Sequence, residues 1–269
     1  MLALIDADIV LYRNCWASQN ENLDICKFRT DEMIDHILEE TKADEFQLWL
    51  SDNKEANFRY KLDPTYKSTR PLEKPIHFNE IKEFLITDWN AKFAFGMEAD
   101  DALGIEQTKA NTKMNGWVNT DNSIICTIDK DLQQVPGNHY NFVKKEFKFV
   151  TPEEGLRFFY SQLLIGDTSD NIQGCRGIGP KKTAKILGGL QGEQDLFYAV
   201  VNTYCAQHNE WNECQVLSHI AKIGPLLKIR QTEDEPLWQS PKNSLEAFDS
   251  YKEELRESMT GVTSIMLGV

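Results

Sequence analysis

The sequence predicts an α/β fold, with a largely parallel central sheet flanked by helices and a second lobe made of helices. Up to residue 150, short apolar or β-branched runs alternate with amphipathic helical patterns, which is typical of strands joined by crossover helices. From residue 151 onward helical patterns dominate. The chain has 269 residues, of which 41% are hydrophobic and 26% charged, so it can bury a substantial core.

The first part of the chain opens as a βαβ unit. We expect strands at 2–5, 46–50, 92–95 and 123–128, and a further strand or hairpin at 142–150. Helices are expected at 31–42, at 79–89 and from Glu98 onward, while the residues between the first strand and residue 31 read as a polar connection.

The second part begins with Thr151 as helix N-cap and Pro152 at the first helical position. Helices are expected at 152–164, 180–187, 195–208 and 213–229. We therefore divide the chain into a core (1–150) with a short arch segment near 54–90, a helical lobe (151–238), and a tail (239–269) of unknown role with a weak amphipathic stretch at 245–259.

No apolar run approaches the roughly 20 residues that a membrane span needs, and Met1 leads into a strand with no basic leader. We expect a cytoplasmic protein without a membrane partner. The six cysteines form no CxxC pair and no zinc spacing, which favours reduced thiols.

Three of the expected strands end in an aspartate, namely Asp6, Asp52 and Asp129. The carboxyl ends of parallel strands lie at one rim of an open sheet, so these side chains should converge there. The sequence adds a carboxylate cluster at the start of one helix and further carboxylates nearby: Glu98, Asp100, Asp101, Asp131, Asp167 and Asp170.

So many carboxylates in one cleft require cations, because like charges raise each other's pKa. Oxygen ligands alone suit Mg²⁺ or Mn²⁺, and a pair of such ions favours phosphodiester hydrolysis. Each acidic residue taken alone is more typical of a helix cap or a turn, and Asp8 and Asp121 are assigned that role. The joint occurrence at equivalent strand ends favours the metal site.

A glycine-rich turn at 174–179 leads into the helix expected at 180–187, whose free N–H groups suit a phosphate. Pro180 stands where a Walker A loop requires lysine, which argues against a nucleoside triphosphate. The turn and helix start supply a backbone-binding set without a nearby acid: Arg176, Gly177, Gly179, Lys181 and Lys182. A plain helix–turn–helix packing element is the alternative interpretation.

The segment 58–70 interleaves aromatic and basic residues, a composition that stacks bases and clamps phosphates, or forms a solvated loop. The chain has 29 basic and 42 acidic residues and a net charge of −13, which argues against a nucleic-acid partner. That argument is weak, because nine of the carboxylates are predicted metal ligands.

Six motifs together resemble the superfamily of 5′-to-3′ exonucleases and flap endonucleases, a PIN-like fold, and especially its stand-alone phage members. In chain order they are Leu4-Ile5-Asp6-Ala7-Asp8, Ser51-Asp52, the segment 63–70, Glu98-Ala99-Asp100-Asp101, the segment 127–131, and the segment 166–172 leading into Gly177-Ile178-Gly179. The resemblance covers most of residues 1–235.

The resemblance implies that one metal site is held by Asp6, Asp52, Glu98, Asp100 and Asp129, and that Asp131, Asp167 and Asp170 complete a second. It also implies that Lys67 and Arg70 steer the scissile phosphate beside Tyr66. The region near 164–190 is similar to a helix-three-turn-helix, which grips duplex DNA and often holds K⁺. Only 27 residues separate Arg70 from Glu98, which indicates a short arch.

From this resemblance we expect a monomer that removes nucleotides from 5′ ends of duplex DNA, with flaps and RNA/DNA hybrids as further substrates. Two alternatives remain open. One is a catalytically silent DNA-structure-binding protein of the same fold, and the other is a PIN-type ribonuclease, which would not need the turn at 177–183.

Overall fold

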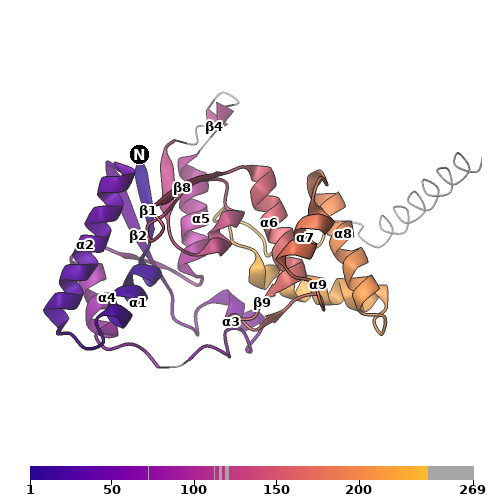
Figure 1. The fold of residues 1–269 in the computed structure, drawn as a ribbon, viewed down its shortest axis with the longest axis horizontal. Coiled ribbons are helices and arrows are strands. Elements are labelled where there is room, and N and C mark those ends of the chain that lie inside the picture. The colour runs from indigo at the N-terminus through magenta and orange to yellow at the C-terminus, as the bar shows by residue number, and fades with distance from the viewer. Residues whose placement is uncertain (72, 112, 115–116, 119–120, 242–269) are drawn as a thin grey trace, which may run out of the picture.

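A six-stranded sheet forms the centre of the computed structural model, which describes residues 1–71, 73–111, 113–114, 117–118 and 121–241 (Figure 1). In spatial order its strands are β3 (Lys92–Ala94), β2 (Glu45–Ser51), β1 (Leu2–Asp6), β6 (Ser123–Cys126), β7 (Gly137–Asn141) and β8 (Glu146–Val150). The first five pair in parallel, and β8 runs antiparallel to β7. The predicted largely parallel sheet is confirmed.

Helices cover both faces of this sheet. Because side chains alternate along a strand, Ala3 and Ile5 of β1 face one way and Leu4 the other. The first face packs against α1 (Ala7–Ala17), α2 (Leu23–Thr41) and α4 (Phe78–Thr87). Leu4 packs with Leu103 of α5 (Ala99–Ala110) and with Leu132 of the 3₁₀ helix η1 (Lys130–Gln134).

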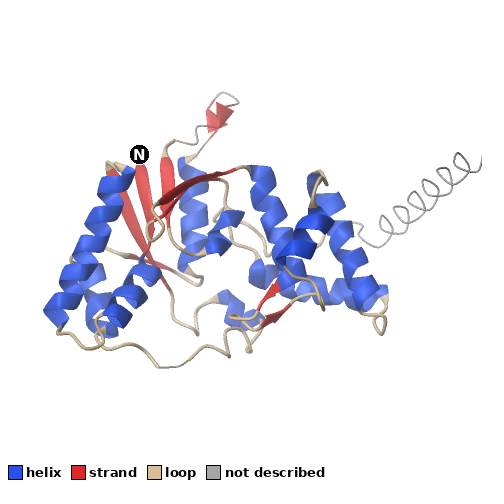
Figure 2. Ribbon diagram, viewed as in Figure 1, coloured by secondary structure: helices blue, strands red, loops and turns tan. Residues whose placement is uncertain are grey.

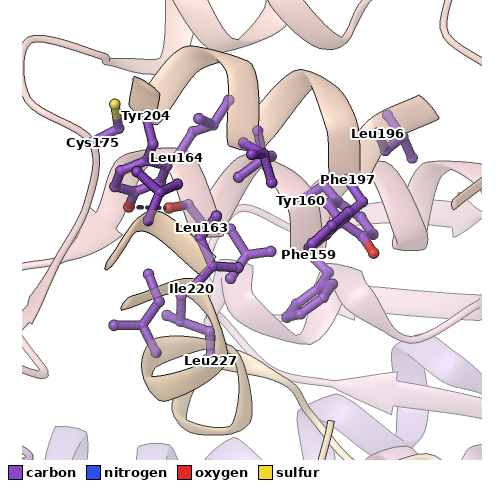
Figure 3. Packing of buried hydrophobic residues seen from close by; sticks show 14 of the residues in the cluster. Phe159, Tyr160, Leu163, Leu164, Cys175, Leu196, Phe197, Tyr204, Ile220 and Leu227 are labelled. Carbon is purple, nitrogen blue, oxygen red and sulfur yellow. Dashed lines mark hydrogen bonds between the residues drawn. The ribbon is translucent and has the colours of Figure 1, made fainter. Parts of the chain in front are cut away.

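A second core lies in the part of the chain that follows β8, which contains α6 (Pro152–Ile165), α7 (Pro180–Leu187), α8 (Gly192–Gln207) and α9 (Glu213–Leu227). Figure 3 shows its centre, where Phe159, Leu163 and Phe197 pack together and the Tyr204 hydroxyl donates to the Leu163 carbonyl at 2.8 Å. Thr151 caps α6 as predicted.

Two short antiparallel pairs complete the described strands, β4 (Lys113–Met114) with β5 (Trp117–Val118) and β9 (Gly166–Asp167) with β10 (Ile172–Gln173). Figure 2 shows the helices surrounding the large sheet and the β9–β10 pair lying among the helices of the second part. The β9–β10 pair connects α6 to the turn that precedes α7.

Several expected elements were wrong in extent. The residues after β1 form α1, not a polar connection, because Asp6 caps a helix whose buried face includes the polar Asn14 while Tyr12 and Trp16 are exposed. That mixture hides the helical period. The next helix starts at Leu23 instead of residue 31, and the short helix α3 (Phe58–Leu62) was not predicted.

The expected strand at 142–150 is the second half of a hairpin, whose first strand, β7, has the largely polar sequence GNHYN. The tail prediction at 245–259 lies outside the described residues. Among the helices that the structure describes, none combines the length and the apolar character needed to cross a bilayer.

Candidate active site

The strand ends at the rim of the sheet position the first carboxylates. Asp6 is the last residue of β1 and caps α1, and its Oδ2 accepts a hydrogen bond of 2.8 Å from the Thr127 hydroxyl, which follows β6. Asp129 caps η1 by accepting the N–H of Asp131 at 2.9 Å. Glu98 caps α5 and so brings Asp100 to the same rim.

The charges of neighbouring carboxylates raise the pKa of Asp6 and the pKa of Asp100, which indicates that these side chains lie close together. Burial, together with the charges of Asp8 and Asp129, raises the pKa of Asp6 to about 7, although hydrogen bonds from Thr127 and Ile9 offset part of the rise. Burial, together with the charges of Asp6, Asp129 and Glu98, also raises the pKa of Asp100 well above its ordinary value. The structure therefore brings Asp6, Asp100 and Asp129 together, as the sequence predicts.

A second set extends toward the acidic loop, which we define as residues 166–171. Burial, together with repulsion from Asp129 and Asp167, raises the pKa of Asp131 to about 7. The Oδ1 atom of Asp131 is buried without a hydrogen-bond partner. A buried carboxylate oxygen without a partner is costly and indicates a missing cation or proton.

The basic loop, residues 66–70, is joined to the acidic loop and to α5. The Lys67 ammonium pairs with Glu98 and lies 3.8 Å from Oδ2 of Asp170, while the Arg70 guanidinium pairs with Asp170. Although burial disfavours the charge on Glu98, Lys67 and Arg59 more than offset this and lower its pKa. Lys67 and Arg70, which are predicted to steer the phosphate, therefore form ion pairs with Glu98 and Asp170, which are predicted metal ligands.

Tyr66 does not lie where the sequence predicts. Its side chain is 2% exposed, and its hydroxyl lies 3.1 Å from Oε2 of Glu98 and 2.9 Å from Oδ2 of Asp170. A ring buried in this way cannot stack on a base without a rearrangement. Its predicted contact with DNA is therefore corrected to a contact with two carboxylates.

Asp101 is also corrected. It is fully buried, and both of its carboxylate oxygens bind the guanidinium of the buried Arg59, with Oδ1 at 2.9 Å. Backbone N–H groups of Glu98 and Arg230 donate to the same carboxylate at 3.2 and 3.0 Å. Its lone pairs are satisfied by protein, so Asp101 is a structural residue and not a metal ligand. Its partner Arg59 lies 42 residues away along the chain, so no local pattern in α5 indicates this role.

Asp52 stands apart from the carboxylates described above. Its oxygens accept hydrogen bonds from the backbone N–H groups of Gly96 at 2.8 Å and Asn53 at 2.7 Å, which lower its pKa. Its charged neighbours are Lys82 and Lys61. Its predicted place in the first metal site is not formed in this structure.

Asp8 takes a place that the sequence analysis missed. Its Oδ2 accepts the backbone N–H of Ser51 at 3.1 Å, and burial raises its pKa. Its charged neighbours are Glu98 and Lys67, so the side chain faces the rim. No local pattern indicates this contact, because the Ser51 N–H at the end of β2 lies 43 residues away along the chain.

The donor set suits hard divalent cations, because it consists of carboxylates alone. Within the described parts of the chain, no three of these side chains already stand at the spacing that holds one ion. Mg²⁺ usually binds one or two carboxylates directly and keeps several waters. Asp6, Asp100 and Asp129 would hold one ion, and Asp131 with the acidic loop would hold another.

The glycine turn, residues 174–179, leads into α7 as predicted. Gly177 has φ +71°, which favours glycine, and its carbonyl accepts the Lys182 ammonium at 2.8 Å. Pro180 occupies the first helical position of α7, and Arg176, Lys181 and Lys182 are exposed. The exposed cations beside a helix N-terminus are free of ion pairs with carboxylates of their own turn.

Comparison with known proteins identifies a family for this chain. Residues 1–159 match the family model described as "5′-3′ exonuclease, N-terminal resolvase-like domain". The chain is 29% identical over 205 residues to DNA polymerase I of Borreliella burgdorferi, covering 69% of this chain and 22% of that protein. It spans about a fifth of the length of the polymerases it matches.

A second relative is closer in length. The 5′-3′ exonuclease of Mycoplasma pneumoniae is 26% identical over 214 residues, which cover 68% of this chain and 70% of that protein.

Solved structures show the same fold. The T5 D15 protein co-crystallised with metal ions aligns with a TM-score of 0.51 at 15% identity, covering 84% of this chain and 94% of that one. A complex of the bacteriophage T5 D15 flap endonuclease with DNA and metal ions aligns with a TM-score of 0.52 at 16% sequence identity. The alignment covers 83% of this chain and 93% of that one. With the family model matching more than half of its residues, this chain belongs to the family of the 5′-3′ exonuclease N-terminal resolvase-like domain.

Proposed function

We propose that this protein is a divalent-metal-dependent 5′-to-3′ exonuclease that hydrolyses phosphodiester bonds of duplex DNA from 5′ ends. The observation that carries the proposal is the group of buried carboxylates at the sheet rim, with the partnerless oxygen of Asp131 among them. The names of the relatives, which are exonucleases and flap endonucleases, support the same chemistry.

The carboxylates would hold two ions of Mg²⁺ or Mn²⁺. Carboxylates at the strand ends and on α5 would bind one ion, and Asp131, Asp167 and Asp170 would bind the other. Bound ions of this kind would activate a water and stabilise the leaving oxygen. Lys67 and Arg70 would turn from Glu98 and Asp170 toward the scissile phosphate when the cations neutralise these carboxylates. These two side chains would then donate hydrogen bonds to the phosphate and stabilise the negative charge that develops on it.

The glycine turn and α7 would hold the duplex backbone without reading its sequence. Arg176, Lys181 and Lys182 supply the positive charge, and the N–H groups at the start of α7 face a phosphate. We further propose that K⁺ binds main-chain carbonyls of this turn and that the protein acts as a monomer in the cytoplasm. The region near 164–190 would then act as the helix-three-turn-helix that the family resemblance implies.

The arch is the part of the proposal that limits the substrate. Of the described residues between Arg70 and Glu98, only α4 is helical, and it packs on α1 through buried Phe78 and Ile81. A helix bound to the core cannot form a tall arch. Removal of nucleotides from a duplex 5′ end is therefore favoured over threading of long flaps.

The test uses duplex DNA labelled at its 5′ end, incubated with and without Mg²⁺. We expect short 5′-phosphorylated products only with Mg²⁺, and none from Asp129→Asn. Asp35→Asn, a neutralised exposed carboxylate on α2, is the matched control and should cut at the wild-type rate.

The same assay decides between the alternatives. Tight binding of DNA without metal-dependent products would favour a silent DNA-binding protein, and preferential cleavage of RNA would favour a ribonuclease. Either result would overturn the proposal. Parallel reactions with RNA/DNA hybrids and 5′ flaps define the substrate range.

A further inference from the structure

We propose that the Phe95 ring is a stacking surface for the base of the nucleotide on the 5′ side of the scissile phosphate. This role rests on the proposed function for its substrate, and on contacts within the described residues for its geometry. It also gives a purpose to Asp52, whose carboxylate binds backbone N–H groups instead of joining the other carboxylates of the rim.

Phe95 is the most exposed of the large apolar side chains that the structure describes, at 81%. It directly follows β3, at the rim where the parallel strands of the sheet end. Single exposed apolar side chains are ordinary on protein surfaces, so exposure alone assigns no role. The exposed Phe147 is such a case, because its ring stacks on the buried Tyr140 with centroids 4.6 Å apart. Phe95 differs in its place at the rim and in the way its backbone is held.

Hydrogen bonds on two sides hold the turn that carries Phe95. The Gly96 N–H donates to Oδ2 of Asp52 at 2.8 Å, and the Asp52 N–H donates to the Met97 carbonyl at 3.2 Å. The Gly96 carbonyl accepts the N–H of Phe58, at the start of α3, at 2.9 Å. Gly96 has φ +74°, a conformation that favours glycine. Asp52 is therefore a positioning residue, and the backbone that carries the exposed ring is fixed before any ligand arrives.

The order of the strands places Phe95 on one side of the predicted metal site. β3 and β2 lie on one side of β1, which ends in Asp6, and β6, which leads to Asp129 and Asp131, lies on the other. Two strand spacings, roughly 10 Å, separate β3 from β1. The acidic loop lies beside Asp131 and leads through β10 into the glycine turn. A duplex held by that turn, with its scissile phosphate at the carboxylates, therefore presents its 5′-terminal nucleotide to Phe95.

The charges beside Phe95 suit a nucleic-acid strand. Besides hydrogen bonds from backbone N–H groups, the ammonium groups of Lys82 and Lys61 lower the pKa of Asp52, so both lysines lie near this turn. Their two positive charges outweigh the single charge of the carboxylate that holds the turn. An aromatic ring beside cations binds an unpaired base of any sequence, because every base has a π face and the cations attract the phosphates. The ligand that fits this surface is therefore an unpaired nucleotide and not a base pair.

The test measures affinity by anisotropy for two duplexes labelled with fluorescein at a 3′ end, one blunt and one with a short unpaired 5′ end, in EDTA so that no cutting occurs. Phe95→Ala should weaken binding of the unpaired end by about fivefold or more, the size of one base stacked on one ring, and should leave binding of the blunt duplex unchanged. Phe95→Trp keeps an aromatic face and should bind both DNAs as wild type. Phe147→Ala removes an exposed phenylalanine from β8 and is the matched control, with wild-type affinity for both DNAs.

A crosslink locates the contact directly. 5-Iodouracil at the unpaired 5′ position reacts on irradiation with an aromatic ring that stacks on it, and mass spectrometry of the crosslinked peptide should identify Phe95. A crosslink at another aromatic residue, or wild-type affinity of Phe95→Ala for the unpaired end, would overturn the inference even if the wild type cuts DNA. A wild type that forms the expected crosslink but releases no products with Mg²⁺ would instead refute the proposed function.

Discussion

Lys67 is held at the candidate site by its backbone as well as by its charge. Its φ is +55°, uncommon for a residue with a side chain, and its N–H donates to the Asp170 carbonyl at 2.9 Å. Strain of this kind persists where surrounding contacts fix it. The acidic loop therefore determines where the Lys67 ammonium stands. Burial disfavours the charge of this ammonium, but the carboxylates of Glu98 and Asp170 more than offset this and raise its pKa.

The first prediction concerns this ammonium. Lys67→Ala should lower kcat by about 10²–10³-fold, because a preplaced donor to the developing charge is lost. The KM for duplex DNA should change much less. Lys144→Ala removes an exposed lysine from the β7–β8 turn and should leave both constants unchanged. Steady-state kinetics with Mg²⁺ measures both, and equal rates for the two variants would contradict the assignment.

The second prediction concerns protons at the carboxylates. The pKa values of Asp6 and Asp131 are about 7, so at pH 7 each is roughly half protonated. Mg²⁺ requires the ionised forms, and its binding should release about one proton from these two residues together, in addition to any proton held by Asp100, whose pKa is also raised. Calorimetry in two buffers of different ionisation enthalpy gives the number, and Asp131→Asn should release fewer.

The sign of the stability effect follows from the same shifts. Folded-state pKa values near 7 lie above the ordinary 3.8, so these acids favour the metal-free fold at low pH, and that contribution is lost as the pH rises through 7. Thermal melts of the metal-free protein should show Asp131→Asn gaining stability over wild type between pH 6 and pH 8. Mg²⁺ should remove the difference.

At the scale of elements, the start of α5 is joined to the end of α9 by one buried guanidinium. Arg59 is 2% exposed, and besides Asp101 it binds the carbonyls of Leu226 and Lys228, both at 2.9 Å. The hydrogen bonds of its side chain all reach residues distant in sequence. Composition alone suggested a base-stacking role for this region, and only the fold shows that Arg59 is structural.

The third prediction follows from that pair. Arg59→Met should lower the free energy of unfolding by about 3–5 kcal/mol, because it leaves the Asp101 charge buried and unpaired. The double variant Arg59→Met with Asp101→Asn should recover part of this loss. Urea denaturation measures both. Additive losses in the double variant would show that the ion pair does not couple the two residues.

The fourth prediction concerns the β9–β10 pair that carries the acidic loop. A Cβ on Gly174 would lie 2.2 Å from the carbonyl carbon of Ile165, whereas a Cβ on Gly179 meets nothing within 4 Å. Gly174→Ala should therefore cost about 1–3 kcal/mol of stability by overpacking, and Gly179→Ala should cost little. Comparable melting temperatures for the two variants would contradict the close approach.

At the scale of the whole molecule, the sheet and its rim were predictable because strand periodicity and the rule for carboxyl ends of parallel strands act on local patterns. The same local patterns misplaced Asp101, Tyr66 and Asp8, since each owes its role to a neighbour elsewhere in the chain. Asp101 meets Arg59, Tyr66 meets Asp170, and Asp8 meets the end of β2. Such pairings depend on how elements pack, which periodicity does not contain.

The fifth prediction concerns the exposed cations of the glycine turn and α7. Changing Lys181 and Lys182 together to Ala should weaken DNA binding for all sequences and reduce the slope of log affinity against log salt by about 2, since two phosphate contacts are lost. Anisotropy titrations from low to moderate salt measure the slope. An unchanged slope would show that the two lysines do not contact phosphates, and it would favour the alternative interpretation of the turn as a packing element.

Tyr66 belongs by sequence to the first part of the chain, yet its ring packs in the hydrophobic core of the helices that follow residue 151. A chimera joined at residue 150 would thus pair one protein's Tyr66 with another protein's pocket. Recombination between relatives should preserve activity when residues 66–70 and 166–171 come from the same parent. A breakpoint at residue 150, which the sequence suggests, is therefore unsuitable for making chimeras, because it separates Tyr66 from the core in which its ring packs.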